Sequence, residues 1–219
     1  KLDIPGGTVC AAQDSPPPVV TPPPGFTGSC NICNFNRGGS GLTFENLLNE
    51  VAGAVGTPAS VLAGMLNFEG YVPDNPTPGK KHIFNYSDEE IAAISSPGTS
   101  MPYCAESYVG ARGPCRFMPN QWSAYGDTVK SYGYTHTPNI CNLRDCLYAS
   151  AAKMKEDAAR LGTACSYNNS TPPPSGSCNW TPGNAAKSAY HYYGACTDNY
   201  VSTVVNYYYN YTCQSGQPL

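Results

Sequence analysis

The sequence predicts a mainly α-helical domain with long disulfide-cross-linked loops, preceded by an extended proline-rich arm. Three observations predict this class. Apolar residues recur at helical spacing in several segments, 11 cysteines occur among 219 residues, and six prolines fall within residues 15–25. Strand patterns are few. Hydrophobic residues make up 41% of the chain, which is enough for one sizeable core.

The arm is predicted over residues 1–41, which are rich in proline and glycine and contain three of the cysteines. Its proline run favours an extended polyproline II conformation. Two interpretations follow: a linker from a preceding segment, or an element that packs on a neighbouring subunit and so mediates self-association. The folded domain is predicted over residues 42–219.

The helices of this domain are predicted from apolar periodicity and end signals. A first helix is expected over 43–55, where Leu47, Leu48, Val51 and Val55 share one face. Further helices are expected around 88–94, over about 142–161, from 181 to 194 and from 198 onward, with loops over 71–112 and 162–180.

The second helix is predicted to be buried because nearly all of its residues are apolar. Thr57 is read as its N-cap, Pro58 as its first helical residue, and Gly70 as its end. The last helical residue is nevertheless Glu69. Burial would disfavour its carboxylate form and raise its pKa, as a general acid near neutrality requires. The alternative is a helix-terminal glutamate that simply reaches solvent.

The cysteines are expected to form disulfides and not a metal site. Cys30 and Cys33 make one C-x-x-C pair, but no second pair accompanies it and the three histidines lie far apart. No metal or other cofactor is therefore expected. Disulfides require an oxidising compartment, so we expect a secreted or extracytoplasmic protein of the cell envelope or cell surface. The odd count leaves one thiol free or bonded to another chain.

Charge and hydropathy exclude two classes of partner. Charged residues make up 12% of the chain and the net charge is −3, so no basic surface for nucleic acid is expected. No apolar run approaches the roughly 20 residues of a membrane span. The chain opens on Lys1 rather than methionine, which a removed leader would explain.

Residues 109–125 (VGARGPCRFMPNQWSAY) resemble the groove motif of the soluble lytic transglycosylase and goose-type lysozyme family. The family pattern G-A-x-G-x-x-Q-F-M-P-x-x-W is matched at Gly110, Ala111, Gly113, Phe117, Met118, Pro119 and Trp122. Residues 185–194, followed by Tyr200-Val201, look like the late Y-N-x-G helix of the family, and residues 141–158 look like its D-A-x-x-x-A helix. The resemblance covers about residues 43–211.

This resemblance implies a lysozyme-like fold that cleaves the MurNAc-GlcNAc bond of peptidoglycan glycan strands, with Glu69 as the single catalytic residue. Glu69 would protonate the glycosidic oxygen and then deprotonate the C6 hydroxyl of the same muramic residue, which closes a 1,6-anhydro ring. Muramidase-type hydrolysis would need a second carboxyl, for which Asp74 and Glu106 stay open. The implied substrate-binding residues are Tyr190, Arg116, Phe117, Met118, Trp122 and His191.

Several positions depart from the family pattern, among them the serine after the catalytic glutamate, which is Gly70 here. The family glutamine is Arg116, the asparagine after the tyrosine is His191, and Cys115 replaces a methionine or leucine, with Cys104 as a candidate disulfide partner. An Arg116–Glu69 pair would lower the pKa of the acid, whereas an Arg116 directed along the groove would bind lactyl or peptide carboxylates. These departures motivate an alternative: an inactive lysozyme-like subunit of an extracellular filament, secretion or adhesion assembly.

Overall fold

The computed structural model describes residues 30–37, 41–73, 80–102, 104, 106–107, 109–160, 178, 180–195 and 198–213. The proline run of the predicted arm lies outside these residues. The elements in order are α1 (Thr43–Val55), α2 (Ala59–Glu69), β1 (Tyr71–Pro73), β2 (Lys80–His82), the 3₁₀ helix η1 (Ile83–Asn85), α3 (Asp88–Ser95), α4 (Pro119–Tyr125), the 3₁₀ helix η2 (Gly126–Tyr132), α5 (Leu143–Ala159), α6 (Pro182–Tyr193) and α7 (Asp198–Tyr211).

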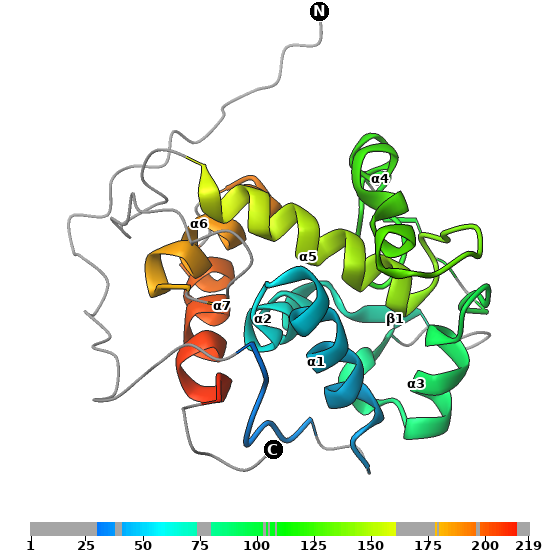
Figure 1. The fold of residues 1–219 in the computed structure, drawn as a ribbon, viewed down its shortest axis with the longest axis horizontal. Coiled ribbons are helices and arrows are strands. Elements are labelled where there is room, and N and C mark those ends of the chain that lie inside the picture. The colour runs from blue at the N-terminus through cyan, green and yellow to red at the C-terminus, as the bar shows by residue number, and fades with distance from the viewer. Residues whose placement is uncertain are drawn as a thin grey trace, which may run out of the picture.

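The mainly helical class is confirmed, and α2 lies near the centre of the bundle. It packs most extensively on α7 and also on α1, while α5 packs on α1 and α6 (Figure 1). All residues of α2 from 59 to 66 are buried, as its apolar composition predicts. Within the described part of the chain, no helix is both long and apolar enough to cross a membrane.

The predicted helices occur within a few residues of their expected bounds, but the start of α2 differs. Thr57 does not cap the helix: Pro58 is still extended and is itself the N-cap residue, and no side chain makes a capping bond. The hydroxyl of Thr57 instead donates to the carbonyl oxygen of Ala151 at 2.7 Å. The helix therefore begins at Ala59. The predicted loop over 71–112 also contains a short antiparallel pairing, β1 with β2, in which Tyr71 is opposite His82.

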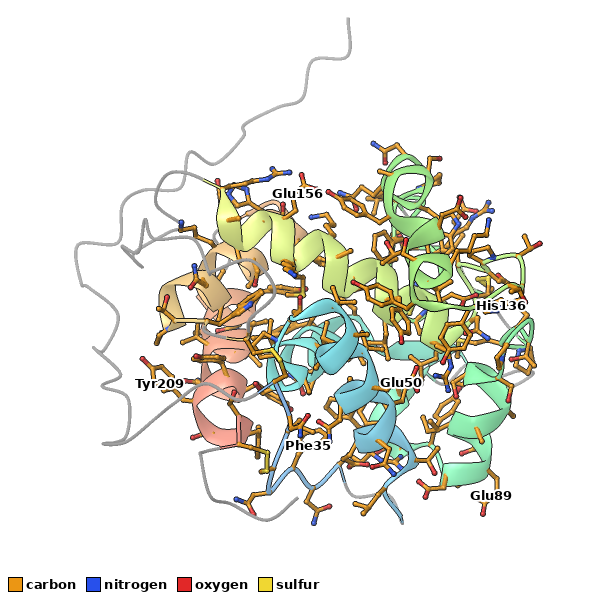
Figure 2. The ribbon with its side chains drawn as sticks, in the orientation of Figure 1. Phe35, Glu50, Glu89, His136, Glu156 and Tyr209 are labelled. Carbon is orange, nitrogen blue, oxygen red and sulfur yellow. A yellow bond between two sulfur atoms is a disulfide. The ribbon has the colours of Figure 1, made fainter. Side chains whose placement is uncertain are left out.

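Residues 30–37 pack into the domain and extend its core beyond the predicted start at residue 42. Ile32 forms an isolated bridge with Thr212 and is only 5% exposed. Phe35, labelled in Figure 2, contacts the rings of Phe44 and Tyr211. The described end of the predicted arm is thus bound to its own domain.

Four disulfides join segments that are distant in sequence, with Cα–Cα distances of 5.0 to 5.8 Å, so disulfide cross-linking is confirmed. The suggested partner of Cys115 was wrong: it bonds Cys146, while Cys104 bonds Cys141. The other three cysteines of the chain lie outside the described residues. The remaining two bonds hold the N-terminal segment: Cys30–Cys178 and Cys33–Cys213.

Candidate functional site

Glu69 is placed by the end of α2, where a buried helix reaches the surface. The helix stops at Gly70, whose N–H donates to the carbonyl oxygen of Leu66 at 2.8 Å. A Cβ at Gly70 would lie 2.5 Å from a methyl group of Ile83, so only glycine allows this close approach. The chain therefore turns away directly after Glu69, and its carboxyl is left partly buried.

Burial dominates the electrostatics of this carboxyl and raises the pKa of Glu69 from 4.5 to about 7. Two groups oppose the shift: the hydroxyl of Tyr200 and, more weakly, the charge of Arg116 both lower the pKa. The attraction of Arg116 is therefore too small to keep Glu69 ionised. A carboxyl with a pKa of about 7 can both donate and accept a proton at neutral pH.

Tyr200, on α7, is the tyrosine that acts on Glu69. Its hydroxyl is buried and has no hydrogen-bond partner of normal geometry among the described residues, yet it lies near enough to Glu69 to lower the pKa of that carboxyl. Burial and the neighbouring Glu69 in turn raise the pKa of Tyr200 well above its ordinary value, so it stays a neutral donor.

Tyr192, on α6, forms hydrogen bonds with two other segments of the chain. Its hydroxyl donates to the carbonyl oxygen of Cys115 at 2.8 Å and lies 2.9 Å from the hydroxyl of Ser150. Burial raises the pKa of Tyr192, and the charge of Glu69 adds to the rise. Tyr192 and Tyr200 therefore approach Glu69 from two different helices.

A narrow hairpin over residues 106–117 presents Arg116. Arg112 bridges both Glu106 and Phe117 through backbone pairing, and the Phe117 ring is only 1% exposed. Arg116 itself has φ of +53°, in the left-handed region that residues other than glycine rarely occupy. The positive charge of the side chain at this strained position lowers the pKa of Glu69.

Aromatic rings surround this group. Phe68 lies with its ring centroid 5.0 Å from that of Tyr200, and Tyr193 stacks on Tyr200 at 4.7 Å. Phe68 is 36% exposed and Tyr193 49% exposed. Exposed rings of this kind offer apolar faces to a ligand beside Glu69.

Of the predicted site residues, Glu69 and Arg116 are brought together. Phe117 is buried and packs edge-on against Trp122 and Tyr192, so its role in the described structure is to hold the hairpin and not to present a surface. Met118 is partly buried and immediately precedes α4.

Tyr190 and His191 are both partly buried on α6 and contact each other, with ring centroids 4.9 Å apart. Within the described part of the chain, no hydrogen bond or ring contact joins Tyr190 to Glu69; the tyrosine hydroxyl that acts on this carboxyl is that of Tyr200. Burial lowers the pKa of His191 and favours its neutral form. Substrate binding by these two residues stays a prediction.

Of the two candidates for a second acid, the structure describes only Glu106. Glu106 forms an ion pair with Arg112 on the exposed side of the hairpin, and Asp74 lies outside the described residues. Among the residues that the structure describes, no group of three histidine, cysteine or acidic side chains could hold a metal ion.

A pocket of about 500 Å³ lies at the end of α2 and includes Phe68, the ring that contacts Tyr200. Its polar groups already bond one another in part, because the Nε2 atom of His82 lies 3.1 Å from the carbonyl oxygen of Asn67 and its Nδ1 atom accepts from the N–H of Phe84. The lining residues are Arg37, Asn67, Phe68, His82, Phe84 and Asn85.

No protein-family model, curated protein or solved structure matches this chain.

Proposed function

We propose that this chain is a secreted peptidoglycan-cleaving enzyme, a lytic transglycosylase or a lysozyme-type muramidase, with Glu69 as its acid. The observation that carries the proposal is a partly exposed carboxyl whose burial raises its pKa to about 7. Such a carboxyl is about half protonated at neutral pH, so it can protonate a leaving group. The four disulfides are compatible with an extracytoplasmic location.

The reaction we propose needs one carboxyl. Glu69 donates its proton to the glycosidic oxygen, the bond between C1 of muramic acid and that oxygen breaks, and C1 becomes oxocarbenium-like. The C6 hydroxyl of the same sugar then bonds to C1 and returns its proton to Glu69, so no water is consumed. Among the described residues, the groups that act on the pKa of Glu69 are Tyr200 and Arg116 and include no second carboxyl, which supports this route over one that needs two carboxyls at a defined separation.

The decisive experiment compares Glu69→Gln with the wild type on purified cell-wall sacculi, with Glu106→Gln as the matched control. Removing the acid is expected to lower the rate of cleavage by about a hundredfold or more, a typical loss for a positioned acid. The exposed, ion-paired Glu106 is expected to be dispensable. Mass spectrometry of the products distinguishes anhydro from hydrated ends.

Two outcomes would overturn the proposal: unchanged cleavage by Glu69→Gln, or no cleavage by the wild type. In the second case, self-assembly seen by size-exclusion chromatography would support the inactive structural subunit instead.

A further inference from the structure

The pocket at the end of α2 has a volume of about 500 Å³, which is within the usual range of small-ligand sites in proteins. Three parts of the chain form it: the N-terminal segment contributes Arg37, α2 contributes Asn67 and Phe68, and residues 82, 84 and 85 complete the lining. Among the described residues, no residue of the motif over 109–125 lines it. The ligand of this pocket therefore has to be inferred from the chemistry of its own walls.

The charge of Arg37 is already neutralised within the fold. Its guanidinium donates to the carbonyl oxygen of Tyr86 and to the Oδ1 atom of Asp88, and its Nε atom lies 3.6 Å from the Oε2 atom of Glu45. The Arg37 side chain is only 1% exposed. The pocket therefore offers no free cation to an anionic ligand, and no carboxyl among its described lining residues attracts a cation.

His82 is an uncharged part of the wall, because both of its ring nitrogens already have partners. The Nδ1 atom accepts from the N–H of Phe84 at 3.1 Å, which places the ring proton on Nε2. The Nε2 atom then donates to the carbonyl oxygen of Asn67, 3.1 Å away. Burial lowers the pKa of His82 and favours this neutral form. The lining thus favours a neutral ligand.

Two side-chain amides provide the hydrogen-bonding groups that remain. The Oδ1 atom of Asn67 accepts from the hydroxyl of Tyr207 at 3.0 Å, which orients the amide and leaves its Nδ2 atom without a partner among the described residues. Asn85 is exposed, and its side chain makes no hydrogen bond in the described part of the chain. An amide side chain both donates and accepts, so these two groups suit a ligand that does the same.

Two phenylalanine rings provide the apolar surface of the pocket. Phe68 is 36% exposed, so part of its ring is open to a ligand. Phe84 is buried against Phe35 and Phe44, with ring centroids 5.3 and 5.6 Å apart, and forms a fixed wall. Aromatic rings and neutral amides together match a sugar, which has C–H groups on one face and polar groups at its edge.

We propose that this pocket binds a neutral N-acetylated sugar, with the Phe68 ring against its C–H face and the amides of Asn67 and Asn85 on its acetamido group. An N-acetylglucosamine unit has this chemistry. The carboxylate of a muramic residue would find no free cation in the pocket. The inference goes beyond the proposed function, since it requires no cleavage and applies equally to an inactive subunit.

The test titrates ¹⁵N-labelled protein with chitotetraose, a neutral tetramer of N-acetylglucosamine, and follows the side-chain amide signals of Asn67 and Asn85. Cellotetraose, which has hydroxyl groups in place of the acetamido groups, is the matched ligand. We expect chitotetraose to shift both signals, and the Kd for cellotetraose to be about tenfold higher or more. Equal Kd values, or shifts confined to residues 106–117, would overturn the proposal.

Two variants remove the two kinds of contact. Asn85→Ala and Phe68→Ala should each raise the Kd for chitotetraose about fivefold or more. Asn120→Ala is the matched control, because Asn120 is exposed on α4 and is not among the described lining residues, so its Kd should equal that of the wild type. Asn85→Ala decides the test even if Phe68→Ala fails to fold, because it removes no hydrogen bond of the described structure. An unchanged Kd for Asn85→Ala would contradict the proposal.

Cleavage of sacculi, measured on the same protein, separates this inference from the proposed function. Binding of chitotetraose in the pocket by a wild type that does not cleave sacculi would remove the enzyme and keep the sugar site. Cleavage of sacculi without a shift of the two amide signals would keep the enzyme and remove the sugar site.

Discussion

The hydroxyl of Tyr192 donates a 2.8 Å hydrogen bond to the carbonyl oxygen of Cys115 and thereby ties α6 to the hairpin that carries Arg116. The same hydroxyl lies 2.9 Å from the Ser150 hydroxyl of α5, so one phenol joins three segments. Since Cys115 is also bonded to Cys146, the hairpin is attached to the helices both covalently and through this phenol.

Replacement of Tyr192 by phenylalanine is expected to lower the free energy of unfolding by about 1–3 kcal/mol. The change keeps the ring but leaves the carbonyl oxygen of Cys115 and the hydroxyl of Ser150 without this partner. Urea unfolding followed by circular dichroism measures the loss. Tyr193→Phe is the matched control, because Tyr193 is 49% exposed. Equal stability of the two variants would contradict the assigned role.

Replacement of Tyr200 by phenylalanine is expected to move the pH profile of cleavage to higher pH. The Tyr200 hydroxyl lowers the pKa of Glu69, so its removal lets that pKa rise above its present value of about 7. Because Glu69 must be protonated to act as the acid, the alkaline limb of the kcat/KM profile should also move to higher pH.

The control for this shift is Tyr207→Phe on the same helix, whose hydroxyl donates to the Oδ1 atom of Asn67 at 3.0 Å. The alkaline limb of the kcat/KM profile of Tyr207→Phe should lie at the same pH as that of the wild type. A downward shift for Tyr200→Phe would show that the phenol does not stabilise the ionised carboxylate.

Replacement of Glu69 by glutamine is expected to stabilise the protein at alkaline pH. The pKa of Glu69 is about 7 in the folded chain against 4.5 ordinarily, so the folded state holds this proton more tightly. That stability is fully present below pH 4.5 and is lost as the pH rises through 7, by at most about 3 kcal/mol.

Glutamine cannot ionise. The free energy of unfolding of Glu69→Gln minus that of the wild type should therefore increase between pH 4.5 and pH 8. Thermal unfolding at both pH values measures this gain. The exposed carboxyl of Glu106 gives the comparison, because Glu106→Gln is expected to show no such gain. A difference that stays constant with pH would refute the raised pKa.

Removal of the Cys33–Cys213 disulfide by Cys33→Ser/Cys213→Ser is expected to lower the free energy of unfolding by only about 2–4 kcal/mol, despite a sequence separation of 180. The remaining Cys30–Cys178 bond leaves a short covalent route between the same two points, through residues 30–33 and 178–213. The loss should resemble that of Cys104→Ser/Cys141→Ser, whose separation is 37. A far larger loss of stability for Cys33→Ser/Cys213→Ser would show that the Cys30–Cys178 bond does not limit the effect of removing its neighbour.

Most of the helices were predictable because each depends on its own residues, whereas α4 and the two 3₁₀ helices lie in segments where no helix was expected. The apolar face of residues 43–55 recurs as α1 with the same bounds, and Thr181 caps α6 through a bond from the N–H of Asn184 at 3.2 Å. At Thr57 the prediction was wrong: Pro58 stays extended, and the Thr57 hydroxyl bonds the carbonyl oxygen of Ala151 on another helix, a contact that no local pattern indicates.

The position of Glu69 was predictable from the apolar helix that it ends, whereas its partners were not. Tyr200 lies on a face of α7 whose pattern indicates core packing, and nothing local indicates that its hydroxyl reaches α2. The pairing of Cys115 with Cys146 likewise depends on how the hairpin meets α5, which spacing along the chain does not encode.

The Cys33–Cys213 bond also has a mechanical consequence. Tension applied to the chain before residue 33 and after residue 213 would pass directly from one sulfur to the other. The Cys30–Cys178 bond shares this load with residues 178–213, which include α6 and α7, whereas α2 with Glu69 at its end lies outside both covalent routes. A domain joined at both ends to a stretched cell envelope would keep its interior geometry while its flanking segments straighten.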